Sequence, residues 1–401
     1  MPYLLVFVIS LLMVAACNRI ELVRWRRSEG AHWAERARLY FPALAARGIN
    51  LFLLPLTGCF LVWGLVPAAN NGWHFIPAFL GAILGNYPFD RVNAPDLAVW
   101  QWAREACGAL VLHAHGLLLF AIGVRFMPNH AGWRMAAVTA AYLLVHFALQ
   151  FGLIRILRAL HLLRPAPPRV HEIVAAASAA LGVPVRGVWE MTYLGTNAFA
   201  VVTTGDVAFT SRLLAGFSDE EVRVIAAHEL GHLSESRWTR AARLLGSLVF
   251  LPVIFLGPAG ARWGLTGVAV AVVLSLLILA LRTRLSRAME KRADHVATQT
   301  ETENAAYARA LEHLHRANQI PAVLHKRATL THPDLYDRMI ASGLTPDFPR
   351  PAPPPRSWTS VPLYFVFFAA VIFYSLATTP PKKTDHGEET REEKTGEPGQ
   401  R

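Results

Sequence analysis

Residues 218–232 read SDEEVRVIAAHELGH, and this stretch decides how the rest of the chain is interpreted. It begins with a serine that is followed three positions later by a glutamate, the capping box that marks a helix start. On such a helix His228 and His232 share one face, because residues four apart lie one turn above each other. Two imidazoles so placed can bind one tetrahedral zinc ion (Zn2+), and Glu229 can reach a water on that ion. A surface helix that carries these three residues by chance is the alternative interpretation.

A third metal ligand is predicted in residues 286–294, which read SRAMEKRAD. Glu290 and Asp294 are four apart on an expected helix, so one of the two carboxylates can bind zinc. The other carboxylate can hold the far nitrogen of a ligand histidine, or a neighbouring arginine. Alone the pair is a weak signal, because acidic residues at this spacing usually form a solvated helix face.

Chain topology strengthens the assignment of Glu290 as a ligand. Two apolar segments, 241–260 and 264–281, separate it from His232, and two membrane crossings return a chain to the side that it left. An odd number of crossings would put Glu290 and the histidines on opposite sides of the bilayer. We therefore expect a transmembrane hairpin that folds Glu290 back onto both imidazoles at the membrane surface.

The composition indicates an integral membrane protein. The chain has 401 residues, of which 53% are hydrophobic and 17% charged, and its mean hydropathy is +0.32. Soluble domains are about a quarter charged. The formal net charge is +11 and the pI is about 10.0, but the arginines cluster beside apolar runs. That placement favours anchoring of spans on the cytoplasmic side, so nucleic acid is not expected as a partner.

Eight apolar segments are candidate spans of the lipid bilayer, since a spanning helix needs about 20 mostly apolar residues. The segment 74–88 is short and contains Pro77, Gly81 and Gly85, so it is a short span, a re-entrant piece or an interfacial helix. If it crosses, three arginine-rich stretches share the cytoplasmic side, which predicts a multi-pass protein of the cell inner membrane with a cytoplasmic catalytic domain. The candidates are residues 3–18, 50–68, 74–88, 107–126, 135–154, 241–260, 264–281 and 360–378.

The expected fold class is mainly α, a polytopic helical membrane protein with a zincin-like α+β catalytic domain at the membrane surface. After a proline-broken linker at 164–168, residues 170–181 are typical of an amphipathic helix that stops at Gly182. Residues 183–190 and 198–203 are typical of strands, and 207–210 of the return strand of a hairpin. The chain divides into an N-terminal membrane region (1–155), two catalytic parts (156–240 and 282–357) around the hairpin (241–281), a last span (358–379) and a charged, disordered tail (380–401).

Residues 196–338 resemble the membrane gluzincins that include the CAAX prenyl endopeptidases and the HtpX-type quality-control proteases. This covers a little over a third of the chain, and the combined pattern is far more specific than the two histidines and the glutamate alone. The N-terminal spans carry no motif that aligns with either subfamily. The matching segments are residues 197–200, 213–217, 218–232, 286–297 and 331–333, together with Arg338.

The resemblance implies a role for each matching residue. It implies that His228, His232 and Glu290 bind zinc and that Asp294 supports the site. The remaining implied roles are a strand edge for the substrate backbone, formed by Asn197, Ala198, Phe199 and Ala200, and contacts to the substrate or the developing oxyanion from His332 and Arg338.

These residues predict a zinc-dependent endopeptidase that hydrolyses peptide bonds of unfolded, membrane-associated or lipid-modified proteins, with Glu229 as the general base. A catalytically inactive membrane scaffold or sensor and CAAX-type prenyl-protein processing are the alternatives, and the intact Glu229 argues against the scaffold. A transporter that uses His113, His115 and His146 inside predicted spans is a further alternative. The expected partners are a protein or peptide substrate and the lipid bilayer, while the oligomeric state stays open.

Overall fold

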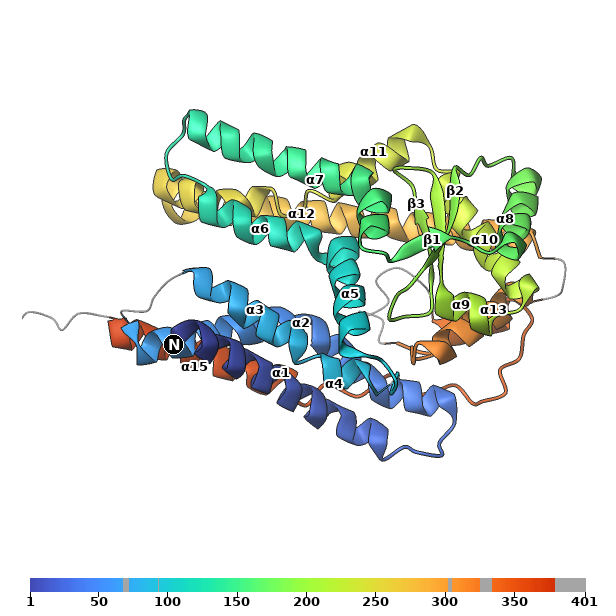
Figure 1. Cartoon of the computed structure of the whole chain (residues 1–401), viewed down its shortest axis with the longest axis horizontal. Coiled ribbons are helices and arrows are strands. Elements are labelled where there is room, and N and C mark those ends of the chain that lie inside the picture. Colours follow the sequence, from blue (N-terminus) through green and yellow to red (C-terminus); the bar gives the residue numbers. More distant parts are fainter. Residues whose placement is uncertain (68–71, 93, 302–304, 325–333, 379–401) are drawn as a thin grey trace, which may run out of the picture.

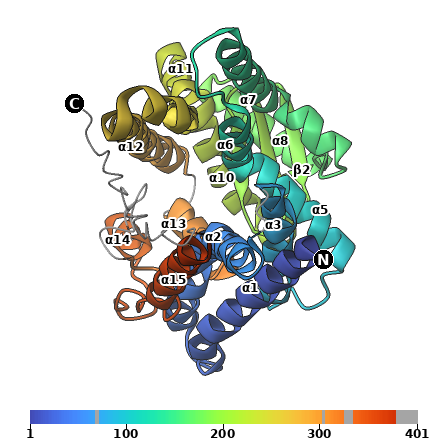
Figure 2. The same cartoon turned by 90° about the vertical axis from the view of Figure 1, so that its left-hand side faces the viewer.

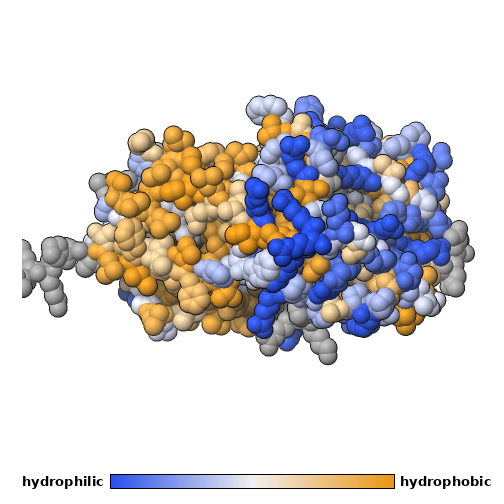
Figure 3. Space-filling view, turned by 90° about the horizontal axis from the view of Figure 1, so that it is seen from below, coloured by the Kyte–Doolittle hydropathy of each residue, from blue (hydrophilic) through white to orange (hydrophobic). Residues whose placement is uncertain are grey.

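The computed structural model describes residues 1–67, 72–92, 94–301, 305–324 and 334–378. Figure 1 shows two halves: long, roughly parallel helices fill one, and a small sheet with shorter helices fills the other. Hydrophobic residues dominate the surface of the helical half and hydrophilic residues that of the sheet half, on the face shown in Figure 3. We call them the apolar half and the polar half. Because apolar side chains are stable against lipid, the apolar half is the part that lies in a bilayer.

The apolar half consists of two groups of helices that lie beside each other, which Figure 2 shows end-on. Apolar side chains form the interior of both groups, for example Val14 with Leu54 in the first group and Tyr142 with Ile254 in the second. The first group contains α1 (Pro2–Arg26), α2 (Trp33–Leu65), α3 (Phe75–Leu84) and α15 (Ser360–Thr378). The second contains α6 (His115–Phe126), α7 (Trp133–Ala159), the 3-10 helix η4 (Pro252–Phe255) and α12 (Leu256–Gln299).

A short connecting region joins the first group to the second. It runs across the molecule between the apolar and polar halves, where α5 stands nearly perpendicular to the long helices (Figure 1). Its last part is a π-helix, a rare form that often occurs at functional sites. The elements are α4 (Tyr87–Asp90), α5 (Val99–Ala109) and η3 (Leu110–Ala114), whereas the 3-10 helix η2 (Gly72–His74) directly precedes α3 in the first group.

Helix length supports fewer complete spans than the eight predicted. Among the described residues, four helices are long and apolar enough to cross a bilayer: α1, α7, α15 and the stretch Pro252–Gln299. The two parts of α2, which meet at a bend of 48°, make a fifth if they count as one span. The eight predicted segments do alternate in direction (Figure 1), but α3 has 10 residues, about 15 Å of helix against a hydrocarbon core of about 30 Å.

The segment 241–260 is also not the single helix that was expected. It begins in α11 (Arg237–Gly246), continues through turns and η4, and ends in the first turns of α12. Pro252 has no backbone N–H to continue a helix through this point. The segment nevertheless crosses the apolar half beside α6, since Phe250 faces Gly116 and Ile254 faces Gly123.

The second half of α12 brings the chain back. Its backbone breaks at Gly264, where φ is 58°, and the helix then continues without interruption to Gln299. Residues 265–299 make about 52 Å of helix, more than a bilayer core needs. The last turns therefore extend into the polar half and carry Glu290 and Asp294 with them, about 13 Å and more beyond the apolar residue Leu281.

A four-stranded sheet organises the polar half, in the order β1-β2-β4-β3. The strands β3 (Ala198–Val201) and β4 (Asp206–Thr210) form the predicted antiparallel hairpin, and β4 runs parallel to β2 (Gly187–Met191). The predicted linker at 164–168 is wrong in part, because Leu163–Pro165 forms β1 and pairs with β2. A proline is tolerated there since β1 is an edge strand.

Helices cover this sheet and enclose the main core of the polar half. The predicted helix at 170–181 is α8 (Pro168–Leu181), and Gly182 ends it with a left-handed φ of 64°. Val174 of α8, Phe209 of β4 and Leu230 of α10 are each at most 1% exposed in one apolar cluster. The remaining helices are α9 (Ser211–Gly216), α10 (Asp219–Leu233), α13 (Ala306–Ala317) and α14 (Leu335–Ala341). The predicted tail, 380–401, lies outside the described residues.

Candidate metal centre

Helix α10 begins with the predicted capping box. The Ser218 hydroxyl accepts a hydrogen bond from the Glu221 backbone N–H at 3.3 Å, and the Glu221 carboxylate accepts one from the Ser218 N–H at 2.8 Å. Acidic residues in the first turn also favour the positive end of the helix dipole. The buried face of α10 then packs into the core, with Val222 and Leu230 fully enclosed. The helix that carries His228 and His232 is therefore held at its start and along its length.

Gly231 lets α12 approach this helix closely. A Cβ atom at Gly231 would lie 2.9 Å from the Cα atom of Ala293, closer than real Cβ contacts allow. Ala293 itself is fully buried between the two helices. Because Ala293 lies between Glu290 and Asp294 in the sequence, this contact sets how far both carboxylates stand from the histidines.

The structure brings His228, His232 and Glu290 together. Each offers one ligand atom, and these atoms lie within 4.8 Å of one another. The Glu290 Oε2 atom is 3.5 Å from His228 Nε2 and 3.6 Å from His232 Nε2. Ligand atoms at about 2.05 Å from a tetrahedral zinc would be about 3.3 Å apart, so the donor set fits that ion. Among the described residues, these are the three side chains that meet this test.

Asp294 contacts the far nitrogen of His228, in the arrangement that its spacing from Glu290 suggested. Its Oδ1 atom is 3.3 Å from His228 Nδ1 and accepts hydrogen bonds from Arg338 at 2.7 Å and from the Tyr307 hydroxyl at 2.7 Å. The Tyr307 oxygen also lies 2.8 Å from His228 Nδ1. Both contacts favour a proton on Nδ1, so Nε2, which faces Glu290, is the nitrogen that can bind a metal ion once its own proton is displaced.

His232 has a matching support that sequence analysis missed. Its Nδ1 atom lies 3.3 Å from Glu235 Oε1, and Arg243 donates to the same oxygen at 2.8 Å. Glu235 is 2% exposed, and the Arg243 guanidinium balances its charge inside the protein. Its position three residues after His232 was a usable signal, because such pairs are neighbours on a helix. Tyr307 gave no comparable signal, since it follows Asp294 by 13 residues and joins the site from another helix.

The carboxylates around the histidines determine their protonation. Burial lowers the pKa of His228, but the hydrogen-bonded Asp294 and Glu290 outweigh it and raise the pKa to about 9. For His232 burial also lowers the pKa, and Glu235 with Glu290 raises it to about 10. In the metal-free protein both imidazoles are therefore protonated at neutral pH. A metal ion must displace these protons, so the affinity for it rises with pH up to this range.

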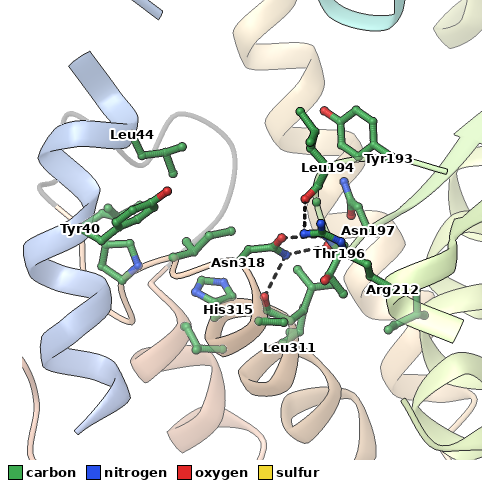
Figure 4. Close-up of a pocket in the computed structure, with 18 of the residues that line it drawn as sticks. Tyr40, Leu44, Tyr193, Leu194, Thr196, Asn197, Arg212, Leu311, His315 and Asn318 are labelled. Atoms are coloured by element: carbon green, nitrogen blue, oxygen red, sulfur yellow. Dashed lines mark hydrogen bonds between the residues drawn. The ribbon is translucent and has the colours of Figure 1, made fainter. Parts of the chain in front are cut away.

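A cavity of about 670 Å³ lies beside the metal centre, and Glu229, the predicted general base, borders it. His228, Glu229 and Tyr307 line one end, and Glu229 is 8% exposed. Figure 4 shows Tyr40 and Leu44 of α2 across the cavity from Tyr193 and Leu194. The first helix group, for which sequence analysis found no role, therefore closes this cleft.

The segment that leads into β3 forms another wall of the cavity and is held firmly. Asn318 accepts a hydrogen bond from the Thr196 N–H at 2.9 Å and donates to the Thr196 carbonyl at 2.6 Å, while Arg212 donates to the Leu194 carbonyl at 2.7 Å (Figure 4). Strand β3 pairs with β4 on one side only and is the edge of the sheet. The predicted substrate edge, residues 197–200, divides between two cavities: Asn197 lines this one together with Glu229, and Phe199 and Ala200 line a second one.

The other predicted residues have different outcomes. His332 lies outside the described residues. Arg338 lines the cavity, but its guanidinium is bound to Asp294, so the structure ties it to the support of His228. Inside the apolar half, His115 Nε2 lies 3.2 Å from Gln150 Nε2, and His146 Nε2 lies 2.8 Å from the Ser247 hydroxyl. Among the described residues, neither His115 nor His146 belongs to a group of three side chains that could hold a metal ion.

Comparison with known proteins finds a family model and several relatives that match part of this chain. Residues 166–342 match the sequence model of Peptidase family M48. A protein named Protease HtpX homolog from Paraburkholderia phytofirmans is 28% identical over 191 residues, which are 44% of this chain and 66% of the relative. Proteins of the same name from Ralstonia pickettii and Ralstonia nicotianae are each 26% identical over 240 residues, 57% of this chain and 77% of each relative. The region that matches the family model, residues 166–342, contains every residue of the metal centre described above.

Proposed function

We propose that the protein is an integral-membrane zinc endopeptidase, because residues 166–342 match the sequence model of Peptidase family M48, relatives named Protease HtpX homolog are similar to the chain, and the chain has helices long and apolar enough to cross a membrane. One observation carries this proposal. Three donor atoms lie within 4.8 Å of one another, and one of the three residues, His228, lines the same cavity as the neighbouring Glu229. A single metal ion and a single acid–base group are what hydrolysis of a peptide bond requires.

The chain's own residues divide the chemistry among them. His228, His232 and Glu290 would hold zinc, which when bound lowers the pKa of a coordinated water and polarises the scissile carbonyl. Glu229 takes the proton from the attacking water and then delivers it to the leaving amine. Asp294 and Glu235 keep the two imidazoles in the orientation that metal binding needs. Tyr307 keeps its proton, because burial raises the pKa of its hydroxyl well above the ordinary value.

The free edge of β3 is the proposed binding site for the substrate backbone. An extended peptide that adds to an edge strand gains affinity from main-chain hydrogen bonds and little from its own sequence. The pocket walls contributed by Tyr40 and Leu44 limit access, so only an extended or unfolded segment reaches Glu229. We therefore propose unfolded or membrane-associated proteins as substrates.

The polar half is proposed to face the cytoplasm. Arginines gather where the helices leave the apolar half on this side, for example Arg155 and Arg158 at the end of α7 and Arg282 and Arg284 in α12. Positively charged residues beside spans favour the cytoplasmic side. Reporter fusions at residues 160 and 378 test this orientation: we expect cytoplasmic signal at 160 and extracytoplasmic signal at 378, and the reverse pattern contradicts it.

The test of the enzymatic proposal compares Glu229→Gln with the wild-type protein. Both proteins are purified as full chains in a neutral detergent, zinc per chain is measured, and cleavage of an unfolded protein is followed. We expect one zinc in both and a loss of cleavage of at least about 100-fold in the variant, the range for removal of a general base. Glu172→Gln is the matched control, because Glu172 is exposed on α8. Cleavage that persists in Glu229→Gln overturns the assigned base, and a zinc-free wild type overturns the metal centre.

A further inference from the structure

A second cavity, of about 890 Å³, lies between the helices of the second group and the edge of the sheet. Apolar side chains from α7, α12 and the segment after α11 supply much of its lining, including Phe151, Leu153, Leu279 and Phe250. Phe151 is 53% exposed and Leu279 is 46% exposed, so the cavity opens on the surface of the apolar half. A pocket of this size is at the upper end of the range of about 300–1,000 Å³ that takes small molecules.

The charged residues that line this cavity are cationic, beside neutral polar residues such as Gln150 and Ser286. Arg240, Arg243 and Arg282 all border it, and no aspartate or glutamate does among the described residues that line it. The three arginines converge from two helices. Arg240 and Arg243 are one turn apart on α11, and Gly246, one turn further on, faces the Arg282 side chain of α12, since a Cβ atom added at Gly246 would lie 3.3 Å from the Cβ atom of Arg282. A site with apolar walls and a cationic mouth matches an anionic amphiphile.

The three guanidinium groups differ in how much of their bonding capacity is used. Arg243 is paired with the buried Glu235, which supports His232, so it already has a structural role. Arg240 uses only its Nε atom, which donates to the Glu235 carbonyl at 3.0 Å, and the rest of its exposed head is open. Arg282 is exposed and has no hydrogen-bond or ion-pair partner among the described residues. Arg240 and Arg282 are therefore the two groups with N–H donors to spare.

Both arginines stand at the level where the bilayer changes from hydrocarbon to headgroups. Arg282 is the first charged residue after the apolar run of α12 that begins at Leu265. Helix α11, whose Gly246 faces Arg282, lies near the boundary between the apolar and polar halves in Figure 1, and it exposes Trp238 (85%) and Leu245 (63%). Exposed tryptophan and leucine beside arginine are typical of a helix that lies in the membrane interface.

We propose that this cavity binds one anionic phospholipid of the surrounding leaflet, with its phosphate held by Arg240 and Arg282. Arginine forms charge-assisted hydrogen bonds with phosphate oxygens, two at a time from one guanidinium. The acyl chains extend along Leu279 and Phe151, which face the bilayer. A transmembrane peptide segment would fill the apolar part equally well, but it brings no negative charge to the two arginines. The charge of the lining thus selects a lipid over a peptide.

The experiment measures lipid binding to the full chain in a neutral detergent. A fluorescent phosphatidylglycerol and the corresponding phosphatidylcholine are titrated into the zinc-loaded protein, and fluorescence anisotropy reports the Kd of each. We expect phosphatidylglycerol to bind at least about tenfold more tightly than phosphatidylcholine. The double variant Arg240→Gln/Arg282→Gln should lose that difference, while its zinc content stays that of the wild type, since neither side chain contacts a proposed metal ligand.

The matched control is Arg284→Gln, which removes an exposed arginine from the same helix two residues away. Arg284 does not line the cavity. We expect it to leave the Kd of phosphatidylglycerol unchanged. A loss in Arg284→Gln as large as in the double variant overturns the proposal, because it means nonspecific attraction to a basic surface. Equal binding of the two lipids, or displacement of bound phosphatidylglycerol by an uncharged transmembrane peptide, overturns it as well.

Discussion

Two helix contacts in this protein are each made close by a glycine, but they have different functions. In the polar half, Gly231 of α10 lies against the backbone of Ala293 in α12. In the apolar half, Gly81 of α3 lies against the backbone carbonyl of Phe7 in α1. Each glycine removes the Cβ atom that would keep the helices apart. What differs is the surroundings of the contact, and that difference separates a reaction site from a scaffold.

The α10–α12 contact is surrounded by ionisable side chains, and the α1–α3 contact by apolar ones. Beside Gly231 stand His232 and, across the contact, Glu290 and Asp294. The first group instead buries Val6 with Val62 and Ala78, and its buried polar side chains, such as Asn18 and Glu21, form no metal-ligating group among the described residues. Apolar contacts tolerate small shifts, whereas metal ligands must stay within a few tenths of an ångström. The comparison therefore predicts that substitutions at the α10–α12 contact change zinc affinity, whereas similar substitutions at the α1–α3 contact change only stability.

The largest expected effect is that of Glu290→Gln, which tests whether the α10–α12 contact is built around a metal. A neutral amide is a poor replacement for the carboxylate, so zinc affinity should fall by more than about 100-fold, beyond the effect of losing a supporting residue. Competition with a chromophoric chelator measures it. Because the pKa of His228 is raised to about 9 by Asp294 and Glu290 against the effect of burial, wild-type affinity should also rise from pH 6 to pH 9.

The result is compared with Glu172→Gln, the same change at an exposed position of α8. This control should keep both the affinity and its dependence on pH. If Glu290→Gln binds zinc as tightly as the control, Glu290 is not a ligand, and the contact between α10 and α12 is a packing contact like that between α1 and α3.

A smaller effect is expected from Asp294→Asn, which keeps the shape of the side chain but removes its charge. Asp294 orients His228 through Nδ1 and balances Arg338, so zinc affinity should fall about 10–100-fold. Tyr307→Phe removes only the hydroxyl between the same two groups and should cost less. Equal losses in both variants would show that the hydroxyl and the carboxylate act as one unit, while no loss in Asp294→Asn would remove Asp294 from the site.

Local sequence signals predicted the parts of the site that lie on one element. The capping box of Ser218, the shared face of His228 and His232 and the stop at Gly182 depend on neighbours within four residues, and the structure has all three. The pairing of β3 with β4 also follows from a short turn. Such features could be predicted because the interacting groups are close in sequence and their geometry is nearly fixed.

Features that depend on distant segments could not be predicted in the same way. Tyr307 joins His228 from a helix 79 residues later, and β1 pairs with a strand that begins 24 residues after Leu163. The number of long spans was overestimated for a related reason. Hydropathy measures how apolar a segment is, whereas Pro252 and the bend in α2 decide where its helix breaks. The topological argument for Glu290 needed only the reversal of the chain, which irregular backbone can also provide.

The smallest expected effect compares the two glycines directly. Gly81→Ala and Gly231→Ala each add one methyl group against the backbone of a neighbouring helix, at 2.2 Å from Phe7 O and 2.9 Å from Ala293 Cα. Overpacking costs about 1–3 kcal/mol, and the better helix propensity of alanine offsets about 0.5–1 kcal/mol of it. Both variants should therefore lower the stability of the protein by about 1–2 kcal/mol, measured by thermal unfolding in detergent.

Zinc affinity distinguishes the two variants, although their costs in stability are alike. Gly231→Ala displaces the helix that carries Glu290 and should weaken zinc binding about tenfold, the low end of the effect of disturbing a ligand's support. Gly81→Ala should leave zinc binding unchanged, since α3 contributes no side chain to the metal centre. Gly48→Ala and Gly216→Ala are the controls, because a Cβ atom at either position meets nothing within 4 Å. If Gly81→Ala weakens zinc binding as much as Gly231→Ala does, the first helix group is coupled to the metal centre. The connection to examine is then the cavity wall at Tyr40 and Leu44, because α2 and the metal centre border the same cavity there.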